Sequence, residues 1–211
     1  MIDYTLYVIT DNILSQGREH AEVARAAIQG GATVIQFRDK ALGSRALLET
    51  AGEIKALCKQ AGIPFIANDR LDIALAVDAD GLHLGQEDLP AAIARKFLGK
   101  GKILGVSATN LDEALQAEAE GADYLGVGPI FATGTKPDAA PPMGVEELRE
   151  VVERVSMPVV AIGGIGHGNV SQVIAAGADG VAVISAVVSA PDIAAATAEL
   201  LARIRVARGG R

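Results

Sequence analysis

The 211-residue chain alternates between short runs of Val, Ile and Leu and longer stretches in which apolar residues recur every three or four positions. The short runs are typical of buried parallel strands, and the longer stretches are typical of the amphipathic helices that connect such strands. We expect helices near residues 18–29, 44–60, 111–120 and 145–155, among others. We expect strands near residues 5–10, 33–38, 64–68, 81–84, 103–107, 124–127, 159–162 and 180–184.

Eight strand–helix units fit a chain of this length only tightly. With 211 residues, each unit has about 26 residues, which is close to the lower size limit of a (β/α)₈ barrel. We therefore predict an α/β fold, a (β/α)₈ TIM barrel, formed as a single domain by residues 1–211. A doubly wound open sheet is the structural alternative.

A weak internal repeat agrees with the barrel. Segments 78–84, 121–127 and 177–183 resemble one another, and segment 30–35 is a looser copy. Each begins where a helix is expected to end, so we predict left-handed helix caps at Gly30, Gly121 and Gly177. The Asp residues of the repeat then lie at the amino ends of strands. That face of a barrel generally serves stability, so these carboxylates are not counted as catalytic groups.

Polar or glycine-rich residues follow the expected end of every strand. Because the active site of a barrel is built from the loops that follow its strands, this placement predicts an active site at the carboxyl-terminal face. The segments are Thr10-Asp11, Arg38-Asp39-Lys40, Asn68-Asp69-Arg70, Gln86-Glu87-Asp88, Ser107, Thr133-Gly134-Thr135-Lys136, Gly163-Gly164 and Ser185.

Gln36 and Arg38 lie on the inward face of their strand, because side chains alternate between the two faces. Polar groups inside a barrel are costly unless something at its mouth satisfies them. Arg38 with Lys40 offers a forked contact and a point charge to a diphosphate. A buried ion pair with Asp69 or Asp88 explains Arg38 alone equally well.

Asp69 and Asp88 follow neighbouring strands, with amide oxygens close by in the sequence. Such a set suits a hard cation such as Mg²⁺, which usually takes one or two carboxylates and bridges substrate phosphates. A soft metal is not expected, because Cys58 is the only cysteine and the histidines lack ligand spacing. The alternatives are a helix cap for Asp69 and a solvated loop for Asp88.

The last two strand ends and a long loop indicate a second anion site. Gly163-Gly164 and Ser185 follow the seventh and eighth strands, where barrels commonly hold a phosphate on backbone N–H groups. A plain turn is the alternative. Residues 129–144 lack periodicity and indicate a loop that covers the substrate, in which Lys136 is able to complete an anion site. Two anion sites fit an enzyme that joins or splits two phosphorylated small molecules.

Composition excludes several other classes of protein. Half of the residues are hydrophobic and there is one Cys, which excludes a disordered chain and a disulfide framework. The apolar runs are shorter than the roughly 20 residues of a membrane span, and no secretory signal is visible, so we expect a cytoplasmic protein. The net charge of −7 argues against nucleic acid as a partner but not against phosphorylated ligands. A homo-oligomer remains compatible with the sequence.

Across nearly its whole length the chain resembles the thiamine-phosphate synthase family. Any single matching segment is unspecific, whereas the full set in this order is highly specific. The segments are YVITD (7–11), QFRDK (36–40), NDRLD (68–72), HLGQED (83–88), GVGPIF (126–131), TGTK (133–136), AIGGI (161–165) and GVAVIS (180–185).

The resemblance implies a (β/α)₈ barrel that uses Mg²⁺ to join hydroxymethylpyrimidine diphosphate to hydroxyethylthiazole phosphate, giving thiamine monophosphate and diphosphate. It implies that the pyrimidine–diphosphate bond ionises first and that the thiazole nitrogen captures the resulting cation. The implied catalytic residues are Arg38, Lys40, Ser107 and Lys136.

The same resemblance assigns three sets of binding residues. At the pyrimidine diphosphate it implies Gln36, Phe37, Arg38, Asp39, Lys40, Asn68, Ser107 and Lys136. At the thiazole phosphate it implies Thr133, Gly134, Thr135, Gly164, Ile184 and Ser185. The implied metal ligands are Asp69 and Asp88.

One departure and two rival functions need stating. The family often has a His after Ser107, but this chain has Ala108-Thr109-Asn110 there, so only Ser107 is assigned in that segment. The nearest rival is a thiazole tautomerase, a related barrel with an acid–base His after the sixth strand, where this chain has Pro129. A non-catalytic sensor of phosphorylated ligands, or a barrel scaffold for a partner protein, is the rival from another class.

Overall fold

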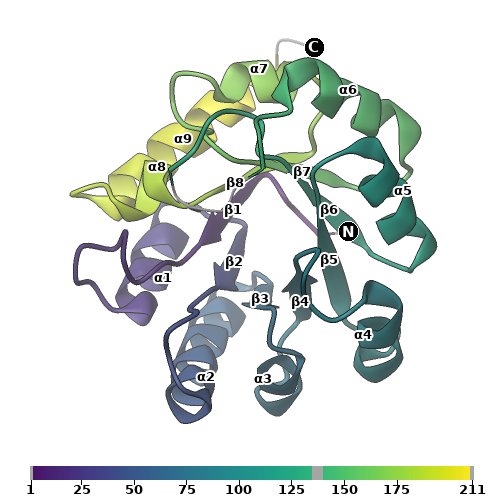
Figure 1. Cartoon of the computed structure of the whole chain (residues 1–211). Helices are drawn as coiled ribbons and strands as arrows, with labels where there is room; N and C mark the ends of the chain where they lie inside the picture. The colour runs from purple at the N-terminus through teal and green to yellow at the C-terminus, as the bar shows by residue number, and fades with distance from the viewer. Residues whose placement is uncertain (1, 135–139, 210–211) are drawn as a thin grey trace.

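The structure is a computed structural model that describes residues 2–134 and 140–209, and its strands close into a parallel barrel (Figure 1). Each strand pairs with the next one in the sequence, and β8 closes on β1 with Leu6 opposite Val181. The predicted (β/α)₈ barrel is confirmed. The strands are β1 (Leu6–Ile9), β2 (Val34–Phe37), β3 (Phe65–Asn68), β4 (Gly81–Leu84), β5 (Ile103–Ala108), β6 (Tyr124–Val127), β7 (Val159–Ile162) and β8 (Gly180–Val183).

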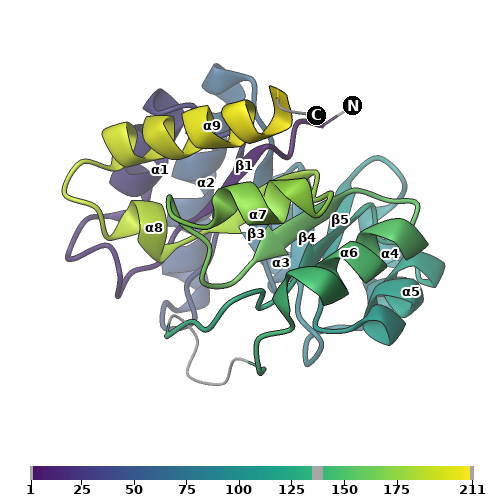
Figure 2. The ribbon, with the colours of Figure 1, turned by 90° about the horizontal axis from the view of Figure 1, so that it is seen from above.

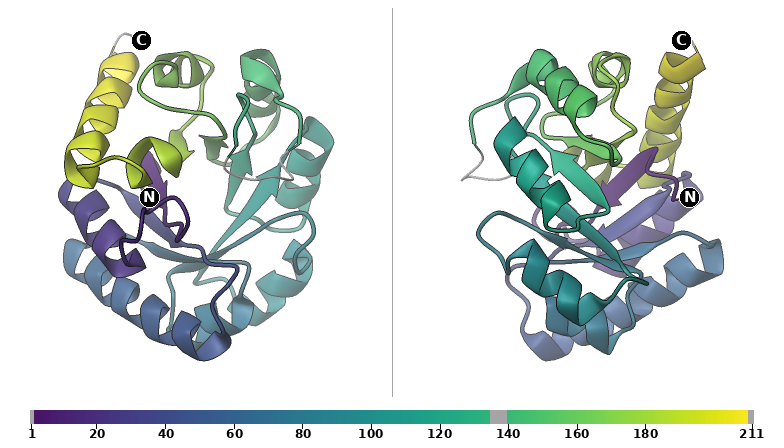
Figure 3. Two further views of the ribbon diagram at one scale, coloured as in Figure 1. Left: turned by 60° about the vertical axis from the view of Figure 1, so that its left-hand side comes forward. Right: turned by 90° about the vertical axis from the view of Figure 1, so that its right-hand side faces the viewer.

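The helices form an outer ring around the strands (Figure 3). A short helix, α8, follows β8 directly, and the long helix α9 then packs against α1 and α7 (Figure 2). The helices are α1 (His20–Gln29), α2 (Ser44–Ala61), α3 (Leu71–Ala76), α4 (Ala91–Leu98), α5 (Leu111–Ala119), α6 (Gly144–Arg154), α7 (Val170–Ala175), α8 (Ser185–Val188) and α9 (Ile193–Gly209). In the described parts of the chain, no helix has the length and apolar character needed to cross a bilayer.

Two glycines make room for aromatic side chains inside the barrel, where the Tyr124 ring packs against those of Tyr4 and Tyr7 with centroids 4.8 and 5.9 Å apart. A Cβ atom added to Gly105 would collide with the Tyr124 ring, and one added to Gly126 would lie 2.9 Å from the His83 ring. Close packing requires that large side chains face small ones. The two glycines therefore leave room for a tyrosine and a histidine inside the barrel, below its mouth.

The internal repeat builds four side-chain clamps at the amino-terminal end of the barrel. In each clamp the residue just before an even-numbered strand accepts a hydrogen bond from a backbone N–H at the start of the preceding odd-numbered strand. Such N–H groups need a partner when they are buried. The clamps are Thr33 with Leu6 (3.0 Å), Asp80 with Phe65 (2.8 Å), Asp123 with Leu104 (2.7 Å) and Asp179 with Val159 (2.8 Å).

The predicted left-handed caps are confirmed at two of the three glycines. Gly121 and Gly177 have φ of +89° and +109°. The prediction for Gly30 is wrong: its φ is −77°, and the left-handed residue is Gly31 at +94°. Gly30 is small for another reason, since an added Cβ would lie 2.5 Å from Thr197 Cβ in α9.

Candidate functional site

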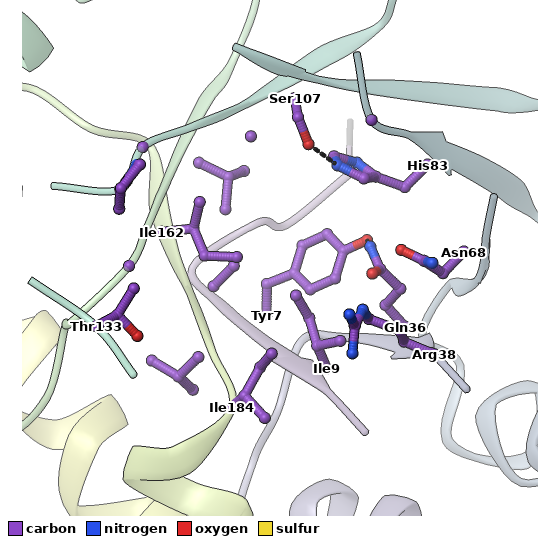
Figure 4. Close-up of a pocket in the computed structure, with 18 of the residues that line it drawn as sticks. Tyr7, Ile9, Gln36, Arg38, Asn68, His83, Ser107, Thr133, Ile162 and Ile184 are labelled. Atoms are coloured by element: carbon purple, nitrogen blue, oxygen red, sulfur yellow. Dashed lines mark hydrogen bonds between the residues drawn. The ribbon is translucent and has the colours of Figure 1, made fainter. Parts of the chain in front are cut away.

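A cavity of about 320 Å³ opens at the carboxyl ends of the strands. Figure 4 shows that its two sides differ in chemistry. Gln36 in β2, Arg38 just after β2 and Asn68 in β3 lie on one side. Ile162 in β7 and Ile184 just after β8 lie on the other. The predicted location of the site at this face therefore coincides with a cavity that has a polar and an apolar half.

Two positively charged side chains, from the segment that follows β2, line the polar half of the cavity. The Arg38 side chain is 15% exposed, and its Nη1 donates to Asp11 Oδ2 at 3.1 Å. Lys40 is 64% exposed, and its Nζ lies 3.7 Å from Asp69 Oδ2. The ion pair considered for Arg38 is thus made with Asp11 rather than with Asp69 or Asp88. Both cations line the cavity, where they offer positive charge to an anionic ligand.

Asp69 and Asp88 lie against each other beside these cations. Burial, together with the hydrogen bond and the charge of the neighbouring Asp88 carboxyl, raises the pKa of Asp69 to about 6. Asp69 also has a left-handed backbone with φ of +59°, which is unusual outside glycine. Asp88 is held by the Gly85 backbone N–H, which donates to its Oδ2 at 2.7 Å.

The Asp69–Asp88 pair fits a divalent cation that is shared with a ligand. Two adjacent carboxylates repel each other when both are ionised, and a cation between them removes that cost. Among residues 2–134 and 140–209, no group of three or more His, Cys, Asp or Glu side chains is arranged to hold a metal. Mg²⁺ does not need such a cage, because it commonly binds one or two carboxylates, waters and substrate phosphates.

A chain of hydrogen bonds crosses the floor of the cavity. Gln36 Nε2 donates to the Tyr7 hydroxyl at 2.8 Å, and this hydroxyl lies 2.8 Å from that of Tyr124. The Tyr124 hydroxyl lies 2.9 Å from His83 Nδ1, and His83 Nε2 lies 3.0 Å from Ser107 Oγ (Figure 4). Burial raises the pKa of both tyrosines well above the usual value, so both hydroxyls keep their protons.

The sequence reasoning did not assign Tyr7, Tyr124 or His83 to the site. All three line the cavity. For His83 a signal was present: the matching segment HLGQED begins with it, and the alternation of β4 turns it to the same side as other inward residues. Tyr7 likewise begins the matching segment YVITD, but no local pattern indicates that its hydroxyl meets that of Tyr124 on a distant strand.

The residues expected at the pyrimidine diphosphate divide into three groups. Gln36, Arg38, Lys40, Asn68 and Ser107 line the cavity. Phe37 and Asp39 lie behind it: the Phe37 ring packs edge-on against His20 with centroids 4.8 Å apart, and the Asp39 side chain, 1% exposed, bonds to the same histidine. Lys136 lies outside the described residues.

A glycine turn after β7 forms the opposite rim. Gly163 and Gly164 have φ of +97° and +64°, and an added Cβ would lie 2.5 Å from Pro129 Cα at the first position and 2.6 Å from the Ala132 carbonyl oxygen at the second. A side chain at either position would push away the segment that follows β6. The turn therefore needs glycine both for its conformation and for this close approach.

Most residues expected at the thiazole phosphate gather around this turn. The cavity wall includes Thr133, Gly164, Ile184 and Ser185. An adjoining hollow is lined by Gly134 and shares Thr133, Gly164 and Ser185 with the cavity. Thr135 lies outside the described residues. The short helix α8 begins at Ser185, at this end of the cavity.

Both the sequence and the fold have relatives among known proteins. The sequence matches the family model described as thiamine monophosphate synthase over residues 6–187. It is 57% identical over 206 residues to the thiamine-phosphate synthase of Chloroflexus aurantiacus, covering 98% of this chain and 95% of that protein. It is 57% identical over 209 residues to that of Moorella thermoacetica, covering 99% and 100%. Among solved structures, thiamine phosphate pyrophosphorylase from Pyrococcus furiosus has a TM-score of 0.91 and 44% identity, covering 98% of both chains.

Proposed function

Because the chain belongs to the thiamine monophosphate synthase family, we propose that it is a thiamine-phosphate synthase that joins hydroxymethylpyrimidine diphosphate to hydroxyethylthiazole phosphate. The observation that carries the proposal is the two-sided cavity. Its polar half places Arg38 and Lys40 beside the Asp69–Asp88 pair, and its other half ends in the glycine turn. This arrangement provides separate places for a diphosphate and for a monophosphate.

The polar half binds the pyrimidine diphosphate. Arg38 and Lys40 contact the diphosphate oxygens, and Asn68 and Gln36 offer amide groups to the same substrate. Asp69 and Asp88 would hold Mg²⁺ there, and the bound ion would supply further positive charge to the diphosphate. Lys136 joins this site in the prediction from the sequence.

The two cations also favour cleavage of the bond to the diphosphate. Negative charge builds up on the diphosphate as it leaves, and donors placed in advance stabilise that charge more in the transition state than in the substrate. Arg38 is well placed because Asp11 holds its guanidinium at 3.1 Å and the side chain is largely buried. The chain thus supports a dissociative reaction, in which the thiazole nitrogen captures a pyrimidinylmethyl cation.

The hydrogen bonds across the floor of the cavity determine whether the Ser107 hydroxyl donates or accepts toward His83. Gln36 Nε2 can only donate, so Tyr7 donates to Tyr124 and Tyr124 donates to His83 Nδ1. His83 then donates from Nε2 to Ser107 Oγ, which leaves the serine hydroxyl proton for another acceptor. We assign that proton to the pyrimidine or to the leaving diphosphate.

The apolar half binds the thiazole phosphate. Ile162 and Ile184 face the space between the two sides, and they exclude water that would otherwise capture the cation (Figure 4). Backbone N–H groups of the glycine turn, with Thr133 and Ser185, take the phosphate at the rim. The two reacting atoms are thereby brought together in one small space.

The proposal is tested by incubating the purified protein with both substrates and Mg²⁺ and measuring thiamine phosphate. We expect product with the wild type. With Asp88→Ala we expect the activity to fall by about a hundredfold or more, because Mg²⁺ would lose one of its two carboxylate ligands beside the diphosphate. Full activity of the wild type in excess chelator, or full activity of this variant, would contradict the metal assignment. Conversion of one thiazole isomer to another without the pyrimidine substrate would favour the tautomerase, and ligand binding without turnover would favour the sensor.

A further inference from the structure

A buried hydrogen-bonded group of three side chains lies behind the cation-rich side of the cavity. His20, the first residue of α1, stands between Thr10, just after β1, and Asp39, just after β2. Its Nδ1 lies 2.8 Å from Thr10 Oγ1, and its Nε2 lies 2.9 Å from Asp39 Oδ2. Thr10 is fully buried and His20 is 7% exposed. None of the three is among the described residues that line the cavity.

The partners of His20 fix which ring nitrogen carries the proton. An ionised carboxylate only accepts, so His20 donates from Nε2 to Asp39. In the neutral ring Nδ1 then accepts from the Thr10 hydroxyl. The Thr10 oxygen keeps its lone pairs, and the backbone N–H of Arg38 approaches it at 3.4 Å. One imidazole ring therefore connects the end of β1 to the loop that follows β2.

Asp39 also binds the backbone of the loop that follows β2. Its second oxygen, Oδ1, accepts from the backbone N–H of Ala41 at 2.7 Å and of Leu42 at 2.9 Å. Lys40 therefore lies between Asp39, which carries this carboxylate, and Ala41, whose backbone N–H is bound to it, and Arg38 immediately precedes Asp39. Phe37 completes the support from the strand side, through its edge-on contact with the His20 ring.

We propose that His20 is a positioning residue for the diphosphate site: together with Thr10 and Asp39 it fixes the backbone from which Arg38 and Lys40 reach the cavity. The inference rests on the proposed function, because it concerns how this chain binds the diphosphate of one substrate. Arg and Lys side chains are flexible, and a ligand that had to order both the side chains and their loop would bind more weakly. A loop fixed in advance lets both cations meet the diphosphate without that cost.

The test is His20→Phe, which keeps the ring and its contact with Phe37 but has no ring nitrogen. We expect KM for the pyrimidine diphosphate, and Kd for inorganic diphosphate measured by calorimetry with Mg²⁺, to rise about tenfold or more. We expect KM for the thiazole phosphate to stay within about twofold, because the glycine turn lies on the other side of the cavity. A loss that is merely structural would change both KM values alike or lower activity in proportion to the folded fraction.

A conservative variant distinguishes the effect of the hydrogen bond to Asp39 from the effect of the imidazole ring. In His20→Gln the amide N–H occupies the place of Nε2 and still donates to Asp39, so we expect Kd for inorganic diphosphate within about threefold of the wild type. If His20→Phe fails to fold, Asp39→Asn carries the test, since an amide has one oxygen for three donors and should raise the same KM and Kd.

The control is Thr197→Val, which removes another fully buried hydroxyl, one that donates to the Ile193 carbonyl oxygen at 2.6 Å within α9. It is expected to lower stability without changing either KM. The proposal is overturned if folded His20→Phe or Asp39→Asn leaves KM and Kd for the diphosphate ligands within about twofold. A wild type that binds inorganic diphosphate but forms no thiamine phosphate would instead contradict the proposed function and leave the His20 test intact.

Discussion

The two ends of the barrel use aspartates in opposite ways. At the amino-terminal end Asp80 accepts from the Phe65 N–H at 2.8 Å and pairs with Lys55 at 2.6 Å, so each of its oxygens has a donor. At the carboxyl-terminal end Asp69 faces another carboxylate, and the pKa of Asp69 is raised to about 6. Asp80 is thus satisfied within the fold, whereas Asp69 and Asp88 at the other end form a strained pair.

This difference explains why the same residue type serves stability in one place and binding in the other. A carboxylate whose hydrogen bonds are all made within the fold stabilises the folded state and has little left for a ligand. Two carboxylates pressed together cost stability, and a bound cation or its ligand gives that free energy back. Substitutions at the amino-terminal end should therefore change stability alone, and substitutions at the carboxyl-terminal end should change binding and activity.

The largest effect is expected from a pair of arginines, one at each end. Arg38→Ala should lower kcat/KM by about a hundredfold or more, because a buried donor to the leaving diphosphate is lost. Arg95→Ala removes a side chain that donates to Gly121 O at the amino-terminal end, so it should lower the unfolding midpoint and leave kcat/KM of the folded protein unchanged. Steady-state kinetics and urea unfolding of both variants measure the contrast. Equal losses of activity would break the comparison.

A pH effect on stability of intermediate size is expected at the strained pair. The pKa of Asp69 is about 6 in the folded protein and about 3.9 when unfolded, so protonation favours the folded state. The metal-free wild type should therefore lose stability as pH rises from about 4 to above 6, by on the order of 2 kcal/mol relative to Asp69→Asn. Urea midpoints measured across this range in chelator test it. A wild type that gains stability over the same range, relative to the variant, would refute the prediction.

The smallest effect is expected at one of the amino-end clamps. Thr33→Val keeps the shape of the side chain but removes the oxygen that accepts from the Leu6 N–H at 3.0 Å. The same hydroxyl donates to the Leu6 carbonyl oxygen at 3.2 Å, and this oxygen keeps its bond from the Thr33 backbone N–H, so the free energy of unfolding should fall by about 1 kcal/mol. Equilibrium unfolding in urea measures this, with kcat/KM as the control. A change in kcat/KM without a change in stability would show that this end of the barrel communicates with the site.

The location of the site was predictable from the sequence, because it follows from two simple regularities. Side chains alternate along a strand, which placed Gln36 and Arg38 on the inward face. Parallel strands end at one face, which brought the residues after each strand together. The confirmed barrel and the observed cavity both depend on these regularities, and so does the contrast between the two ends.

Other features depend on contacts that no local pattern records. Tyr7 and Tyr124 are 117 positions apart, and their hydroxyls meet only because the barrel closes around them. Asp39 lies between Arg38 and Lys40 in a short loop without periodicity. The sequence therefore did not indicate that its side chain is buried against His20 while its neighbours face the cavity. Gly30 and Gly31 are adjacent glycines, and only the structure shows that the left-handed conformation falls on the second, with a φ of +94°.

The amino-end clamps divide the barrel into four quarters. Each clamp ties an odd-numbered strand to the even-numbered strand that follows it, and none of the four ties β2 to β3, β4 to β5, β6 to β7 or β8 to β1. At those seams backbone carbonyl oxygens accept instead of side chains. For example, the Pro64 oxygen accepts from the Ile35 N–H, and the Pro158 oxygen accepts from the Leu125 N–H. A quarter is therefore a strand–helix–strand module that secures its own first strand. A circular permutant opened at a seam keeps all four modules whole, whereas one opened inside a module separates a clamp residue from its strand.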